Sequence, residues 1–422
     1  MNFLKGRQGA GAGSLYVAGA FGISGLLTVV FLGLPERFLS ERDYGGLAQL
    51  WTATFLVVQV LWTGVSQTLG RYVAEREARG EDTAPVLSSV RRVQLVLLAV
   101  FLVVGLAASP LLNQALFGEN WMLTLGFVAA VATYAPEYFR RGTFSGHRQF
   151  ARLGALHVAE STSRMLLGTI LLFAGLGVAG PAAAIVLAPL VGVLAVRPAA
   201  VSHPESPGEP FSAGEAFRFT GPVLLCVAFG QLMMNGGTIL VGLLGGPNAL
   251  RSSAAFFAAL ILMRAPQYVM SPAISALLPN ASHALATHGA PGLDRFILRA
   301  VGVVAAIGLA MVVGAGLLGE WVMDLVFRDL QAERGLLIAL ATLAAFYLLC
   351  ETVSQALFAL GHARLAALGW ACGLLASIFC LAVLDIGLLD KVSISLALGA
   401  GTAAVAQAVL YLLARRSTQA AP

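Results

Sequence analysis

Several polar and charged residues lie inside long apolar stretches, where an ionisable group is costly and points to a function. Arg264 is near the middle of the stretch 252–278. Gln267 and Tyr268 follow it three and four residues later, so the three side chains share one face of a helix. Pro266 interrupts the helical hydrogen bonds beside them. We interpret this face as the wall of a wet cavity in which Arg264 holds phosphate; a structural arginine paired with a neighbouring helix is the alternative.

Two other stretches carry a polar stripe. In the stretch 44–67 and just beyond it, the polar residues recur every four positions: Gln59, Thr63, Gln67 and Arg71. In the stretch 217–244, Gln231 and Asn235 lie one helical turn apart on a common face. Each stripe is consistent with a substrate path and equally with hydrogen bonding between helices. We therefore include all six residues among the candidates for a substrate cavity.

Acidic residues also fall in apolar stretches: Glu137, Glu160 and Glu351. Arg164 follows Glu160 by four residues, and His157 precedes it by one turn. This spacing predicts either a self-neutralising ion pair or a proton-linked or substrate-sensing cluster, with Arg164 as a further cationic residue of the cavity. Glu137 has arginines nearby, whereas Glu351 has no cation one turn away. Glu351 is thus the better candidate for ion coupling, followed by Glu160 and Glu137.

The sequence shows no catalytic arrangement. The six histidines are scattered, the four cysteines show no Cys-x-x-Cys spacing, and neither a Walker motif nor an HExxH motif occurs. The Gly-rich segment 9–14 does not follow a strand, so it lacks the context of a dinucleotide site. We expect no enzymatic activity, no cofactor, no metal ligand set and no nucleic-acid partner. An ion gradient of unknown ion is a candidate energy source.

The composition is typical of an integral membrane protein. Of 422 residues, 58% are hydrophobic and 11% are charged, whereas soluble domains have about 45–50% and about 25%. A soluble globule cannot hide so much apolar surface. The apolar runs are long and continuous, which excludes the alternating segments of about ten residues found in membrane barrels.

The apolar runs predict an all-α protein that crosses the membrane about twelve times. A spanning helix needs about 20 mostly apolar residues. The candidate stretches are 14–34, 44–67, 93–112, 121–138, 154–176, 178–196, 217–244, 252–278, 296–318, 335–358, 364–384 and 392–414. With the N-terminus in the cytoplasm, most of the 26 Lys and Arg residues fall on the cytoplasmic side. We therefore expect a multi-pass protein of the cell membrane with both termini cytoplasmic.

A Pro- and Ser-rich segment at mid-chain divides the predicted helices into two sets of six. We expect an N-terminal lobe at 1–198, a cytoplasmic linker at 199–216 and a C-terminal lobe at 217–422. The segment 65–70 is weakly similar to 274–279, each closing a second helix of its half. Because each half has an even number of spans, the halves are predicted to be parallel repeats.

Three features of the chain resemble polysaccharide flippases of the multidrug/oligosaccharidyl-lipid/polysaccharide exporter superfamily. They are the segment 39–45 with the span that ends at 66–71, the segment 262–266 running on to 274–282, and the arrangement of six plus six helices. The resemblance implies a V-shaped pair of lobes with a cavity that opens alternately to each side of the membrane. It also implies that cationic residues hold the diphosphate of a lipid-linked sugar, with Arg264 at such a family position and Arg71 as a second candidate.

We therefore expect a flippase that moves a polyprenyl-diphosphate-linked oligosaccharide to the outer leaflet for cell-surface polysaccharide biosynthesis. Besides this substrate and the bilayer, a glycan polymerase or glycosyltransferases are candidate partners. The alternatives are a cation-coupled multidrug exporter on the same fold, a lipid II flippase and a non-transporting scaffold. The central positive charge of Arg264 favours an anionic substrate. Lipid II flippases usually have two more helices and arginines in the first helix, where this chain has no arginine and offers Ser24 and Thr28 as its polar wall.

Overall fold

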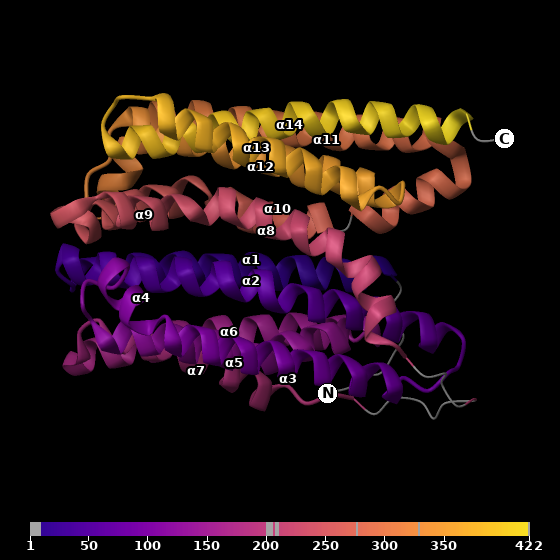
Figure 1. The fold of residues 1–422 in the computed structure, drawn as a ribbon, viewed down its shortest axis with the longest axis horizontal. Coiled ribbons are helices and arrows are strands. Elements are labelled where there is room, and N and C mark those ends of the chain that lie inside the picture. The colour runs from indigo at the N-terminus through magenta and orange to yellow at the C-terminus, as the bar shows by residue number, and fades with distance from the viewer. Residues whose placement is uncertain (1–9, 200–205, 207–210, 276, 328–329, 421–422) are drawn as a thin grey trace. The chain divides into compact units, whose positions relative to one another are not determined.

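The computed structural model describes residues 10–199, 206, 211–275, 277–327 and 330–420. The regular structure of this part of the chain is helical throughout (Figure 1). Apart from the helices, the same residues contain one isolated β-bridge, between Glu81 and Ser206. The protein is thus an all-α protein, as its long apolar runs predict.

The chain divides into two compact units. Unit 1 comprises Met1–Leu39 and Ala53–Leu224. Its helices are α1 (Ala10–Gly33), most of α2 (Glu41–Ala78), α3 (Ala84–Ala107), the short α4 (Ser109–Ala115), α5 (Trp121–Gly146), α6 (Phe150–Leu171) and α7 (Ala179–Ala195). Within the unit, α6 packs against α1 and α7, and α5 packs against α3 and α7.

Unit 2 comprises Ser40–Thr52 and Leu225–Pro422, so the first part of α2 belongs to it. Its remaining helices are most of α8 (Ala213–Leu244), α9 (Ala249–Met263), α10 (Ala265–Ser275), α11 (Leu277–Val326), α12 (Arg334–Ala359), α13 (Ala363–Val383) and α14 (Leu388–Ala420). Within the unit, α12 packs against α11 and α14, and α13 packs against α14. Gln49 fastens the first part of α2 by donating to the Thr238 carbonyl at 2.7 Å.

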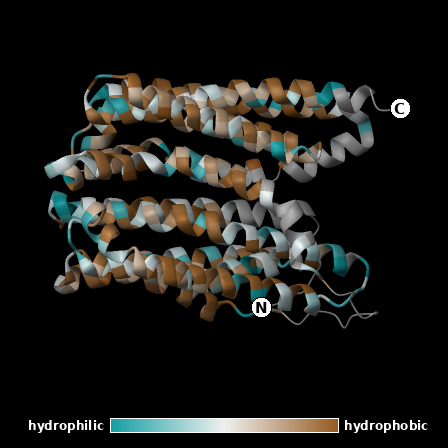
Figure 2. Cartoon of the chain, viewed as in Figure 1, coloured by the Kyte–Doolittle hydropathy of each residue, from teal (hydrophilic) through white to brown (hydrophobic). Residues whose placement is uncertain are grey.

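Helix occupies all twelve stretches that were predicted to span the membrane. By length and composition, eight helices of the described residues can cross a membrane: Gly19–Arg37, Glu41–Glu77, Ala84–Ala107, Val223–Leu244, Pro291–Val326, Arg334–Ala359, Ala363–Val383 and Leu388–Arg416. Among the other stretches, α5 and α6 carry charged residues, α7 has only 17 residues, and Arg264 separates α9 from α10. Figure 2 shows hydrophobic residues along the long helices.

Many large apolar side chains of the helices are exposed. On α3, Val96 is 62% exposed and Val103 is 70% exposed, and on α11 Leu317 is 75% exposed. Exposed apolar side chains in such number are unfavourable in water and fit contact with lipid chains. The multi-pass membrane class predicted from composition therefore agrees with where the apolar side chains lie.

Local signals explain where several helices begin and end. The Asn120 side chain caps the start of α5 by accepting from the backbone N–H groups of Met122 and Leu123. After the end of α12, Gly361 adopts a φ of 78°, a conformation that glycine reaches without steric cost. The His362 N–H then donates to the Leu357 carbonyl at 2.8 Å, which closes the turn into α13.

The predicted linker 199–216 lies largely outside the described residues. Where it is described, Ser206 exchanges backbone hydrogen bonds with the turn after α2, to Gly80 at 3.2 Å and from Asp82 at 3.1 Å. The division into units lies within α8, between Leu224 and Leu225. The lobe boundaries expected from the sequence remain a prediction.

Close packing of α5 on α2 yields a test of the fold. A Cβ added at Gly142 would lie 2.7 Å from the Ser66 carbonyl oxygen and 2.8 Å from the Leu69 Cβ. Because these atoms belong to the body of α2, Gly142→Ala should destabilise the protein by about 1–3 kcal/mol. Gly126→Ala on the same helix is the control, since nothing lies within 4 Å of its Cβ. Thermal unfolding in detergent measures both; equal midpoints would contradict the packing.

Candidate functional site

Polar side chains gather in a cluster inside each unit. In unit 2 the cluster is built around Arg264, at the break between α9 and α10. Pro266 causes the break, since it has no backbone N–H to continue the ladder of α9, and it stands in the first turn of α10, where no such donor is needed. The Arg264 N–H still donates to the Leu260 carbonyl at 3.0 Å. The side chain thus projects from an interruption in an apolar segment.

The guanidinium of Arg264 is held by neutral groups. It donates to Asn235 Oδ1 at 2.7 Å and lies 5.2 Å from the ring centre of Tyr268. Its Nε is buried and makes no hydrogen bond. Within the described residues, no carboxylate lies within ion-pair distance of it. Arg264 is therefore a half-buried cation that keeps donors available for an anion.

Asn235 connects Arg264 to a chain of hydrogen bonds that crosses unit 2. Asn235 donates to Gln231 Oε1 at 2.6 Å, and Gln231 donates to the Tyr347 hydroxyl at 3.5 Å. Glu351 follows Tyr347 by one turn on α12, and its carboxylate is close to the Tyr347 hydroxyl. A single polar network thus links the break after α9 with α8 and α12.

The network contains five residues that the sequence singled out: Gln231, Asn235, Arg264, Tyr268 and Glu351. Glu351 is half-buried, and no cation of the described residues lies within 4.0 Å of its carboxylate. The sixth candidate of this unit, Gln267, is buried on α10. The structure therefore brings one cation and one acid into the same network without pairing them.

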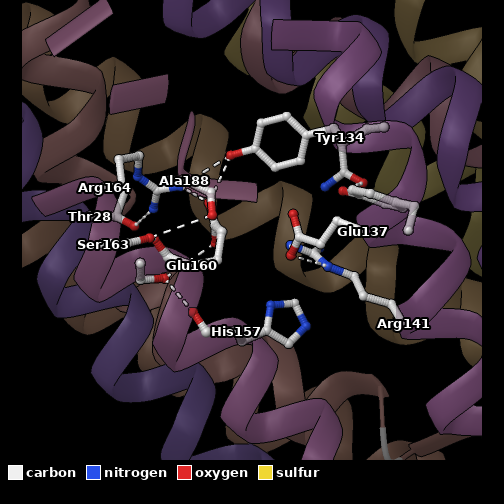
Figure 3. A network of polar contacts seen from close by, with 12 residues as sticks. Thr28, Tyr134, Glu137, Arg141, His157, Glu160, Ser163, Arg164 and Ala188 are labelled. Carbon is white, nitrogen blue, oxygen red and sulfur yellow. Dashed lines mark hydrogen bonds and ion pairs between the residues drawn. The ribbon is translucent and has the colours of Figure 1, made fainter. Parts of the chain in front are cut away.

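In unit 1 the charged candidates Glu160 and Arg164 are paired with each other. Glu160 and Arg164 form an ion pair one turn apart on α6, and both are buried. The Tyr134 hydroxyl donates to Glu160 at 2.8 Å, and Arg164 donates to Thr28 Oγ1 of α1 at 2.8 Å (Figure 3). Phe31 and Phe55 flank the guanidinium at 5.6 Å and 6.0 Å. This geometry is that of the self-neutralising pair predicted as one of the two alternatives.

Glu137 on α5 has a similar arrangement. Its side chain is fully buried, and Arg141 donates to its Oε1 from two nitrogens, at 2.6 Å and 3.0 Å. The Arg141 guanidinium also lies 4.4 Å from the ring centre of Tyr138. The two acids of unit 1 that were candidates for ion coupling thus each have a guanidinium partner.

The polar stripe of α2 separates into two parts. Gln59 accepts from Thr63 of the same helix at 2.8 Å and from Tyr138 of α5 at 3.1 Å, so Gln59 connects α2 to α5. Gln67 is exposed, and Arg71 is exposed and ion-paired to Glu75 at 3.1 Å. The stripe therefore fits a contact between helices at Gln59, whereas the exposed Gln67 and Arg71 remain consistent with a substrate path.

Sequence reasoning missed several partners of the candidates. Tyr134, Thr28 and Tyr347 were not singled out as partners, because the contacts that they make depend on which helices become neighbours. Glu75 was detectable, since it follows Arg71 by four residues. Whether the candidate residues line a substrate cavity remains a prediction.

Comparisons with known proteins agree with this architecture. The model of a family described as polysaccharide biosynthesis protein matches residues 10–284. Two strains of Mycobacterium tuberculosis have an uncharacterized protein that is 27% identical over 385 residues, which covers 85% of this chain and 82% of the relative.

The fold is also similar to solved transporters. A multidrug resistance MATE family transporter of the MOP superfamily, in an inward-facing conformation, matches with a TM-score of 0.72 and 18% identity over 99% of this chain and 96% of its own. A MOP superfamily transporter from Pyrococcus furiosus, whose binding pocket is described as having reverse polarity, matches with a TM-score of 0.69 and 16% identity over 97% and 96%. Since the family model covers more than half of the sequence, the chain belongs to the polysaccharide biosynthesis protein family and has the fold of a MOP superfamily transporter.

Proposed function

We propose that this membrane protein is a flippase that moves a polyprenyl-diphosphate-linked oligosaccharide from the cytoplasmic leaflet to the outer leaflet of the cell membrane. Its product would enter cell-surface polysaccharide biosynthesis, with both termini of the chain in the cytoplasm. The family supports a role in polysaccharide biosynthesis, and the fold supports transport.

The observation that carries the substrate class is the lack of a carboxylate beside Arg264 in the described part of the chain. Arg164 and Arg141 each hold a glutamate, whereas Arg264 contacts the neutral side chains of Asn235 and Tyr268. A guanidinium without an acid partner is costly to bury, and it matches the paired oxygens of a phosphate. An anionic headgroup would complete this site.

The multidrug exporter and the lipid II flippase would each use charged residues other than Arg264. A multidrug exporter of cationic compounds should use deep acids of the N-terminal half, and there Glu137 and Glu160 both have arginine partners. A lipid II flippase would use cations in the first helix. In α1 the polar side chain of Thr28 already accepts a hydrogen bond from Arg164. Glu351 keeps its carboxylate without a cation and is the proposed group for coupling to an ion gradient. A glycan polymerase or glycosyltransferases are the proposed partners.

Depleting the protein from its own cells tests the proposal directly. Mass spectrometry of the lipid extract should show a polyprenyl-diphosphate oligosaccharide that accumulates and disappears when the wild-type copy is restored. An unchanged lipid pool, together with new sensitivity to cationic dyes, would overturn the proposal in favour of a drug exporter. Accumulation of lipid II would identify the lipid II alternative in the same spectrum.

A further inference from the structure

Unit 1 contains a group of potential metal ligands that the flippase proposal does not use. Glu137 comes from α5, and His157 and Glu160 come from α6 one turn apart. All three residues are buried, and one ligand atom of each lies within 4.8 Å of the others. Figure 3 shows the two carboxylates on either side of a common space with the imidazole beside it. We propose that these three side chains form a binding site for a divalent transition metal ion such as Zn²⁺.

The free ligand atoms support this site. Arg141 occupies Oε1 of Glu137, while Oε2 of the same fully buried carboxylate makes no hydrogen bond. Tyr134 and Arg164 occupy Oε1 of Glu160, and Oε2 has only Ser161 at 3.5 Å. Each carboxylate therefore keeps one oxygen for an ion. A buried oxygen without a partner is costly and calls for an occupant.

The surroundings resemble the outer shell of a metal site. Ligating carboxylates are usually fixed by further hydrogen bonds, which here come from Arg141 and from Tyr134 with Arg164. The His157 ring packs against Phe21 at 4.2 Å, which limits its rotation. His157 and Glu160 are three residues apart, a spacing that points both side chains to one side of α6. The three ligands are thus largely held in place before an ion binds.

The donor set and the distances indicate which ion fits. One imidazole nitrogen with two carboxylate oxygens favours transition metals over Na⁺ or Mg²⁺. Ligand distances of about 2.1 Å place the donors of a tetrahedral ion about 3.4 Å apart. Atoms within 4.8 Å of one another reach that spacing by small side-chain rotations. Because two guanidiniums already balance the two carboxylates, we expect binding weaker than that of a structural zinc site, and therefore reversible.

Zinc titration of the full-length protein tests the site. The protein is purified with a tag that contains no histidine, and Zn²⁺ alone is the probe. The wild type should bind one equivalent saturably. His157→Gln should weaken binding by more than about tenfold, since losing even an outer-shell partner costs 10–100-fold. His147→Gln is the matched control, because buried His147 contacts one acid, Glu77 at 2.6 Å, and should leave the affinity unchanged.

Two further measurements keep the proposal testable if His157→Gln does not fold. Glu137→Gln removes a different ligand and should also weaken binding by more than about tenfold. X-ray absorption at the zinc edge of the wild type should show nitrogen and oxygen ligands. Sulfur ligation, the absence of saturable binding, or equal affinities of the wild type and the folded ligand variants would overturn the site.

Discussion

Replacing Arg264 by alanine should abolish clearance of the lipid-linked oligosaccharide while the protein still folds. The change removes the guanidinium, whose hydrogen bond to a described side chain is the one to Asn235. Loss of charge-assisted contacts to a diphosphate costs about 1.5–3 kcal/mol, which is roughly a ten- to hundredfold loss of affinity. Arg264→Lys should clear the lipid less well than the wild type and better than Arg264→Ala, because lysine keeps the charge and loses the paired hydrogen-bond geometry. The measurement is the amount of accumulated lipid in depleted cells that express each variant.

Arg334→Ala is the matched control for Arg264→Ala. Arg334 also lies in unit 2, but its side chain is 61% exposed and is ion-paired to Glu320 at 3.0 Å. This variant should clear the lipid as the wild type does. Full clearance by Arg264→Ala would refute the role of the guanidinium. A variant that clears the lipid but disturbs the assembly of glycan enzymes would favour a scaffold.

Glu160→Gln should destabilise unit 1 by about 3–5 kcal/mol, because it leaves the buried guanidinium of Arg164 without its counter-charge. Replacing both partners by apolar residues, as in Glu160→Leu with Arg164→Met, should recover most of the loss. Unfolding is measured in detergent with a chelator, so that metal binding does not contribute.

The exposed ion pair of Arg71 and Glu75 on α2 provides the comparison for Glu160→Gln. Glu75→Gln breaks the ion pair with Arg71. The side chain of Arg71 is 39% exposed and that of Glu75 is 40% exposed. Such a pair contributes about 0–1 kcal/mol, so the midpoint should hardly move. If Glu160→Gln and Glu75→Gln had the same effect, the buried pair would not be a stabilising contact.

The sequence predicts the helical membrane class well because it depends on composition and on the length of apolar runs, which are local properties. The same holds for contacts one turn apart: the pair of Glu160 with Arg164, and the bond of Gln231 to Asn235, follow from the spacing alone. These contacts need no knowledge of which helices become neighbours.

The spacing of residues along one helix cannot predict contacts between different helices. Arg264 meets Asn235 only because the end of α9 lies beside α8, and Arg164 meets Thr28 only because α6 packs against α1. The grouping of Glu137 with His157 and Glu160 depends on helix packing for the same reason. His157 and Glu160 are neighbours on α6, but the third ligand, Glu137, comes from α5. The assignment of Ser40–Thr52 to unit 2 also depends on packing, since α2 is one continuous helix.

The break at Arg264 has a mechanical consequence. In an uninterrupted helix, tilting one half against the other breaks backbone hydrogen bonds at a cost of about 1 kcal/mol each. Pro266 has already removed one such bond, so α10 can tilt against α9 with little further loss. On the proposed function, this freedom would let the Arg264 guanidinium shift a short distance while it stays in contact with a phosphate headgroup. An unbroken helix would hold the guanidinium at one depth in the membrane. The break at Arg264 would instead allow the guanidinium to change depth together with a bound phosphate.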